Sequence, residues 1–521
     1  MKENKALKNS VFVMLLIILG KVCALIRDSL IAAKFGATDI TDIYIFSLGI
    51  VNLLTTISYG LTTTFIPMHT ENLESGNKKE SNKFVNNVLN TFSMGTIILT
   101  ILMIIFAKYI IYIFGPGFQK DLIVFNTSIK ITRIMLLSLI FISLQSVITG
   151  VLQAHKQFLE PAAMAMVSNI VYIIYLVFLV SNYGMVGFAA AVVLGFFAQL
   201  IINIPKYKKM GYKYSTYINL EDSKTRQMFK LTMPVIISTS VIQLNLAINR
   251  AFATTIFGGA ATILENANKI NTLAYEVFAI GIAMIVYPTL SELAAKNDKK
   301  QYKVELGRAI NIILIIMVPA AVGIAILREP LINIIFKRGA FSNEAASLTS
   351  QALLLYTPAM IAYGVRDILN KAFYAIKDTK TPMINSFIGI IINVVINILL
   401  IKHLGVRGLT LATTISAIII TIIMLLDLNK KLNGIDIKNT ITSFAKIILS
   451  ALFMGVVVVF VNKFILLNLG TGTKGSVISV LICMVVGVIC YAVAIYALKV
   501  EEIQAIVKPV LKILKFKEIN S

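Results

Sequence analysis

Ionisable side chains interrupt several long apolar runs of this sequence, far from the ends of those runs. Each such charge costs roughly 2.5–3.5 kcal/mol at the centre of a bilayer, so these side chains are expected to face one another or water. A group of them that converges could bind a charged substrate inside a membrane protein. The residues are Lys21, Arg27, Asp28, Lys130, Arg133, Arg250, Glu265, Lys269, Glu276, Arg366, Asp367 and Lys371.

The balance of charge in this set favours an anionic ligand. Guanidinium groups bind phosphate oxygens in pairs, so a net cationic cavity suits a diphosphate. The residues expected to contact the substrate are Lys21, Arg27, Asp28, Arg250, Lys269 and Glu276. Secondary candidates for the same cavity are Glu265, Arg366, Asp367 and Lys371.

Structural roles compete with substrate binding at several of these positions. Arg366 and Asp367 could form a local pair, and Asp28 is expected to orient Arg27 rather than to bind substrate itself. Long cationic side chains near helix ends can also snorkel to the membrane surface. This alternative applies to Lys130, Arg133 and Lys371.

The composition indicates an all-α integral membrane protein. Of the 521 residues 57% are hydrophobic and 14% are charged, with a mean hydropathy of +0.84, whereas soluble domains carry about 25% charged residues. The formal net charge is +23. Because Lys and Arg are concentrated in short loops between apolar runs, this charge indicates membrane topology, and no nucleic-acid partner is expected.

Apolar runs long enough to cross a bilayer recur along the chain and predict about fourteen transmembrane helices. The first run, from about Val11 to Ala33, is too long for a cleavable signal and is expected to remain as the first span. The loops on the side of the N-terminus hold most of the Lys and Arg. The positive-inside rule therefore places both termini in the cytoplasm of a multi-pass bacterial inner-membrane protein.

An internal repeat organises the spans. A shift of 221 positions places Pro67 on Pro288 and Lys156 on Lys377, and the same shift places Gly184 on Gly405. Near the start of each repeat, Arg27-Asp28 falls on Asn249-Arg250 when the two FG pairs are aligned. Each repeat contains six spans, so both insert with the same orientation. This predicts two six-helix lobes related by a pseudo-twofold axis along the membrane normal, with a cavity between them.

The predicted divisions of the chain follow from this repeat. The first two are an N-terminal lobe over 1–222 and a C-terminal lobe over 223–430. Two further spans occupy 431–498, and a basic tail over 499–521 has apolar residues at helical spacing that predict an interfacial helix.

No residues are spaced to hold a metal or a cofactor, and none is expected. The role expected for the cysteines is that of small core residues, at Cys23, Cys483 and Cys490. The histidines fall in separate loops, which argues against a metal centre or histidine-based catalysis. They are His69, His155 and His403. The chain is therefore not expected to be an enzyme.

Several segments resemble the MurJ (MviN) family of lipid II flippases, in the MOP superfamily. They are GKVCALIRDSLIAAKFGAT from Gly20, YGLTTTFIPMHTE from Tyr59, REPLINIIFKRGAFS from Arg328 and KAFYAIKDTKTP from Lys371. The resemblance implies fourteen helices, cavity cations on helices one and eight, and a groove for the lipid tail in the last two helices. It places Lys21, Arg27, Asp28 and Lys269 in that cavity. The family's NLLRR segment in helix two reads NLLTT here, from Asn52 to Thr56.

The function expected from the resemblance and the charges is transport of the peptidoglycan precursor lipid II, an undecaprenyl-diphosphate-linked sugar, from the inner to the outer leaflet. Alternating access driven by the membrane potential would do this without ATP. The expected partners are the lipid-linked substrate, membrane lipids and cell-wall synthesis proteins, with the flippase itself a monomer. Alternatives are a flippase for another undecaprenyl-linked polysaccharide, a cation-coupled drug exporter, an intramembrane glycosyltransferase and a non-transporting scaffold.

Overall fold

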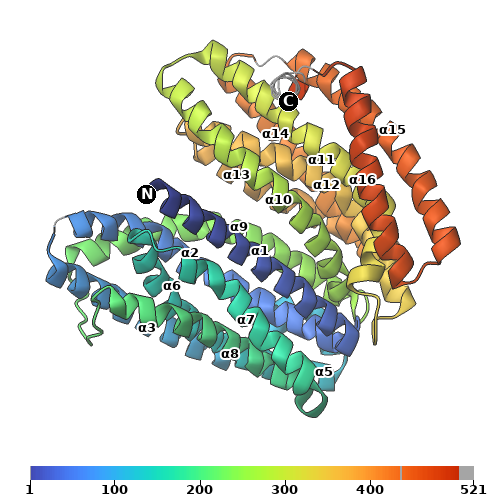
Figure 1. The fold of residues 1–521 in the computed structure, drawn as a ribbon. Coiled ribbons are helices and arrows are strands. Elements are labelled where there is room, and N and C mark those ends of the chain that lie inside the picture. Colours follow the sequence, from blue (N-terminus) through green and yellow to red (C-terminus); the bar gives the residue numbers. More distant parts are fainter. Residues whose placement is uncertain (1, 75, 435–436, 501, 504–521) are drawn as a thin grey trace. The chain divides into compact units, whose positions relative to one another are not determined.

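The computed structural model describes residues 2–74, 76–434, 437–500 and 502–503 (Figure 1). Within these residues the chain forms only helices, joined by turns and loops, and contains no strand. It divides into two compact units, Met1–Thr262 with Arg338–Ser342, and Ile263–Lys337 with Asn343–Ser521. The prediction of an all-helical protein is therefore confirmed.

The first unit contains nine α-helices and one 3-10 helix. They are α1 (Lys2–Phe35), α2 (Asp39–Glu74), α3 (Lys78–Ile105), α4 (Ala107–Phe114), η1 (Pro116–Lys120), α5 (Leu122–Leu136), α6 (Ser138–Ala154), α7 (Leu159–Phe178), α8 (Val180–Lys209) and α9 (Ser223–Thr254). Helix α1 packs along α7, and α2 packs along both α6 and α9.

The second unit contains the remaining helices. They are α10 (Ala260–Ala295), whose first three residues belong to the first unit, α11 (Lys299–Ile335), α12 (Asn343–Ala375), α13 (Lys380–Leu404), α14 (Val406–Lys431), α15 (Ile437–Leu469) and α16 (Thr473–Ala497). Helices α15 and α16 lie side by side and both pack on α11 (Figure 1).

Most of these helices are long and apolar enough to cross a membrane. Among the described residues twelve segments meet this description, with α5 and α6 counted together as Leu122–Ala154. Helices α1 and α10, with 34 and 36 residues, also exceed the roughly 20 residues that a bilayer core requires. Since length alone does not make a helix a span, the predicted total of about fourteen stays a prediction.

The internal repeat is visible in the turns of each unit. Lys156 and Lys377, 221 positions apart, have φ values of 59° and 60°, and each ends a helix with a matching pair of backbone hydrogen bonds. Gly184 and Gly405 have φ values of 55° and 54°. The repeat read from residue identity is therefore also a repeat of backbone conformation. The symmetry axis that it predicts stays a prediction.

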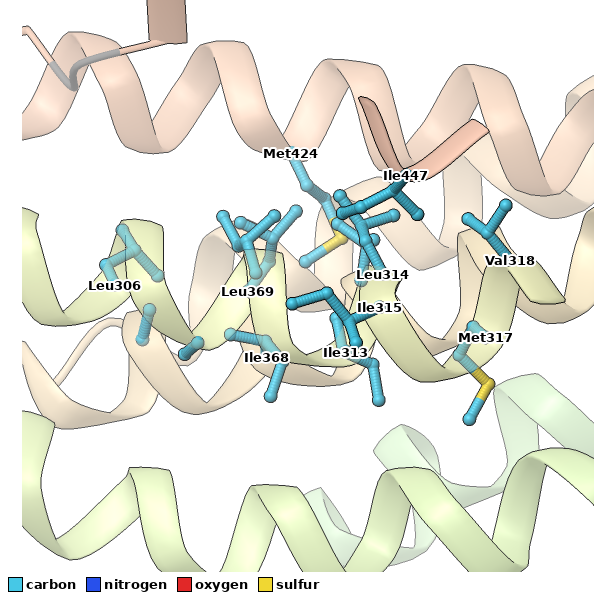
Figure 2. Packing of buried hydrophobic residues seen from close by; sticks show 14 of the residues in the cluster. Leu306, Ile313, Leu314, Ile315, Met317, Val318, Ile368, Leu369, Met424 and Ile447 are labelled. Atoms are coloured by element: carbon cyan, nitrogen blue, oxygen red, sulfur yellow. The ribbon is translucent and has the colours of Figure 1, made fainter. Parts of the chain in front are cut away.

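Each unit has its own apolar core. In the second unit, side chains of α11, α12, α14 and α15 interdigitate, as Figure 2 shows around Leu314, Leu369, Met424 and Ile447. In the first unit, α2, α5, α7 and α8 contribute a cluster around Val51, Ile131 and Phe188.

The helix Ser223–Thr254 packs within the first unit, although the sequence repeat begins its second copy at this helix. The packing units and the sequence repeats therefore divide the chain at different places. The predicted lobe boundary stays a prediction. The interfacial helix predicted in the basic tail falls almost wholly in 504–521, outside the described residues.

Candidate functional site

Arg27 of α1 is held by three polar or aromatic partners in the first unit. Its Nε and Nη2 atoms donate to Oδ1 of Asp28 at 3.0 and 2.8 Å, and Nη1 donates to Oδ1 of Asn169 at 2.9 Å. The guanidinium also lies 5.9 Å from the ring centroid of Tyr172. The Asp28 side chain is 5% exposed and that of Arg27 is 17% exposed. Asp28 thus orients Arg27, as the sequence predicted.

A cavity of about 460 Å³ opens beside this arginine, between α1 and α7. Lys21 lines it two turns before Arg27 on the same helix, and Asn169 joins the cavity to the arginine because it both lines the cavity and accepts from Nη1. The remaining lining is largely apolar, from residues such as Ile17, Pro161 and Met164. An apolar cavity with a few convergent polar groups is typical of a site for an amphiphilic ligand.

Arg250 of α9 lies buried against α2, also in the first unit, with 7% of its surface exposed. A methyl group placed on Gly49 of α2 would come within 2.5 Å of Nη1 of Arg250. The glycine therefore makes room for the guanidinium. Hydroxyl pairs also join the two helices, Thr56 with Ser240 at 3.0 Å and Thr64 with Thr232 at 2.7 Å.

The remaining candidates lie in the second unit. On α10, Glu265, Lys269 and Glu276 are half-buried. On α12, Asp367 accepts a hydrogen bond from the Tyr275 hydroxyl of α10.

The cations of α12 lie near aromatic rings. Arg366 lies 5.1 Å from the ring centroid of Tyr363, and Lys371 lies 5.4 Å from that of Tyr287. Arg366 and Asp367 thus each have a further partner, and the alternative of a local pair between them stays a prediction. The candidate site residues are divided between the two units. Their convergence on one substrate stays a prediction.

The KAFYAIKDTKTP segment forms the turn between α12 and α13. The carboxylate of Asp378 accepts from the backbone and hydroxyl of Thr381 and from Nζ of Lys431. Burial acts to raise the pKa of this carboxyl, but the hydrogen bonds from Lys431 and Thr381 outweigh it and lower the pKa to about 2. The motif is thus explained by a charged, hydrogen-bonded turn at a helix end.

Two histidines that the sequence assigned to separate loops meet in the structure. His69 lies within α2, and its Nε2 is 2.8 Å from the hydroxyl of Tyr212, which is 2.9 Å from Nε2 of His155. The expectation that His69 lies in a loop is therefore wrong. Among the described residues, no group of three or more His, Cys, Asp or Glu side chains is placed to hold a metal ion.

Asp42 is a structurally important residue that the sequence did not reveal. Its carboxylate accepts from the backbone N–H groups of Gly259, Ala261 and Thr262, and from the Thr262 hydroxyl at 2.6 Å. It caps the first turn of α10 from α2. The sequence gives one indirect indication of this role. The Phe257-Gly258-Gly259 segment before α10 has no side chain that could cap the helix, so a cap must come from elsewhere.

Long apolar helices with buried ionisable residues and repeated turns define a polytopic membrane protein of the transporter type. The family model described as Lipid II flippase MurJ matches residues 31–491. The chain belongs to this family, as its motifs predicted.

Relatives with this family name are similar to the chain over most of its length. A probable lipid II flippase MurJ of Rickettsia prowazekii is 28% identical over 465 residues, which cover 88% of this chain and 91% of the relative. A lipid II flippase MurJ of Burkholderia cenocepacia is 25% identical over 422 residues, covering 80% and 82%.

Solved structures agree with the family. The structure of a lipid II flippase MurJ in an inward closed conformation is 27% identical, with a TM-score of 0.76 over 93% of this chain and 97% of that chain. A MATE family multidrug resistance transporter of the MOP superfamily gives a TM-score of 0.68 over 81% and 98%. At 15% identity it indicates a shared fold alone.

Proposed function

We propose that this protein moves lipid II from the inner to the outer leaflet of the bacterial inner membrane, for peptidoglycan synthesis. The observation that supports this most strongly is the oriented Arg27 beside a largely apolar cavity of about 460 Å³ that Lys21 also lines, in a chain of the MurJ family. Arg27 would contact the diphosphate, and the apolar lining of the cavity would contact less polar parts of the substrate.

The transport cycle that we propose is alternating access around one site. Lys269, Arg250 and Glu276 would complete this site with Lys21, Arg27 and Asp28, and α15 with α16 would accommodate the lipid tail. Export of an anion from a negative interior is favoured by about 2.3 kcal/mol per charge per 100 mV. The potential would therefore drive the cycle. Collapsing it with valinomycin and potassium in proteoliposomes should slow flipping, and an unchanged rate would contradict this mechanism.

Complementation of a conditional MurJ-depleted strain tests the function. Wild-type protein should restore growth and cell shape, whereas Arg27→Ala and Lys269→Ala should fail at equal membrane abundance. Lys402→Ala is the matched control, since Lys402 is an exposed lysine at one end of α13. Failure of the wild-type protein despite normal membrane abundance would contradict lipid II as the substrate.

One observation favours a second substrate, another undecaprenyl-linked polysaccharide unit. The MurJ family has an arginine pair in helix two, and this chain has Thr55 and Thr56 at those positions. Their hydroxyls donate to the backbone oxygens of Val51 and Leu53. These hydroxyls add no positive charge. If this substrate is correct, the wild-type protein should complement a strain that lacks a polysaccharide flippase and not the MurJ-depleted strain.

A further inference from the structure

A second cavity with cationic walls lies in the first unit where α4 and α5 meet. Its volume is about 450 Å³. The residues that line it are Lys108, Asn126, Ile129, Lys130, Arg133 and Ile134. Asn126, Lys130 and Arg133 are spaced four and three positions apart, which puts them on one face of α5. The cavity therefore has three positive charges and no carboxylate in its lining.

These charges have no counter-ion within the described part of the chain. Lys108, Lys130 and Arg133 are all exposed, and no carboxylate there forms an ion pair with them. Arg133 uses Nε to donate to the backbone oxygen of Ile104 at 3.0 Å. A guanidinium has five N–H donors, so its Nη groups are available to a further acceptor.

The surroundings of the cavity are those of a lipid-facing surface. The apolar side chains exposed on α3, from the level of Arg133 toward the middle of the helix, include Ile98, Ile101 and Ile105. The span Leu122–Ala154 has 33 residues, or about 50 Å of helix, against a hydrocarbon core of about 30 Å. Lys130 lies about 12 Å from the start of this span. This depth is close to the boundary between headgroups and acyl chains.

We propose that this cavity binds the phosphate headgroup of an anionic phospholipid, with the acyl chains lying along the exposed apolar residues of α3. In the orientation that the basic loops predict, this lipid belongs to the outer leaflet. Three unpaired cations match a phosphate with net negative charge better than a zwitterionic headgroup. The site is separate from the cavity beside Lys21 and does not depend on the transported substrate.

The test measures lipid binding to the purified full-length protein in detergent. Native mass spectrometry would titrate dioleoyl-phosphatidylglycerol, dioleoyl-phosphatidylcholine and, separately, inorganic phosphate. The pocket variant is Lys130→Gln with Arg133→Gln. The matched control is Lys402→Gln with Arg407→Gln, which removes the same charges from exposed positions near the junction of α13 and α14. Lys108→Gln serves as a second pocket variant that breaks no hydrogen bond.

The wild-type protein and the control should bind phosphatidylglycerol alike and in preference to phosphatidylcholine. The double pocket variant should bind it about 30-fold more weakly, and Lys108→Gln should show a smaller loss. The proposal would be overturned if Lys108→Gln bound phosphatidylglycerol as tightly as the wild type. It would also be overturned if the double variant bound this lipid as tightly as the wild type. Saturable binding of inorganic phosphate alone, or no preference over phosphatidylcholine, would also overturn it.

Discussion

Arg27 and Asp28, neighbours in the sequence of α1, form a side-chain ion pair in which Nε and Nη2 of the arginine share Oδ1 of the aspartate. Adjacent helical residues point in different directions, so this pairing bends the guanidinium back along its own helix. Asn169 of α7 receives the remaining bond, from Nη1. The arginine is thereby fixed from two helices before any substrate arrives, which lowers the entropy cost of binding.

Asp28→Asn should weaken both the fold and transport. Loss of the charged hydrogen bonds should lower the free energy of unfolding by about 2 kcal/mol, seen as a lower Tm of the purified protein. Glu329→Gln is the control, because the Arg328–Glu329 pair is 3.9 Å apart and Glu329 is 69% exposed. Its effect should stay within about 0.5 kcal/mol. Equal Tm values for the wild type and Asp28→Asn would contradict this reading of the pair.

Asp42→Ala should destabilise the first turn of α10. Three backbone N–H groups and one hydroxyl lose their acceptor, which should cost at least about 2 kcal/mol. Asp42→Asn keeps one acceptor oxygen and should cost less. Hydrogen exchange at Gly259 to Thr262 is the direct measurement, with Glu71→Ala, an exposed carboxylate at the other end of α2, as the control. Unchanged protection in Asp42→Ala would show that the cap contributes nothing.

Gly117→Ala should disrupt the packing of η1 on the end of α9. A methyl group at this position would lie 1.7 Å from the backbone oxygen of Thr254, so one segment must move. Gly95→Ala is the matched control, since no heavy atom lies within 4 Å of its new methyl group. We expect a clear fall in Tm for the first variant. The second should be neutral or more stable by up to about 1 kcal/mol. The reverse order would contradict the packing described.

Acidification should destabilise the first unit through His155. Burial lowers the pKa of this imidazole in the folded state, so the unfolded state binds more protons below its ordinary value of about 6.5. Stability is therefore present above that pH and is lost as the pH falls through it. Between pH 7.5 and 5.5 the wild-type Tm should fall more than that of His155→Gln. Exposed His403→Gln should behave like the wild type, and identical pH profiles for all three would argue against this role.

The elements of this fold were predictable because their signals are local. Apolar runs mark the helices. The repeat that relates Lys156 to Lys377 can be recognised from residue identities, and the two residues have matching φ values in the structure. The Arg27–Asp28 pair was predictable for the same reason, since the two residues are adjacent.

Partners far away in sequence were not predictable. Asn169 lies 142 positions from the arginine that it contacts, and no periodic pattern marks it. Likewise, only the turn after α8 brings Tyr212 between His69 and His155. These contacts are set by helix packing, which a single sequence does not encode in readable form.

Transport by variants of Arg27 and Lys269 tests whether both cations contact the substrate. Purified wild type, Arg27→Ala, Lys269→Ala and Lys402→Ala would be reconstituted in proteoliposomes with fluorescent lipid II under an imposed potential. Arg27→Ala and Lys269→Ala should each lose most of the flipping rate, while Lys402→Ala should keep it. Wild-type rates in Arg27→Ala and Lys269→Ala, with normal folding and orientation, would contradict a substrate site built from both units.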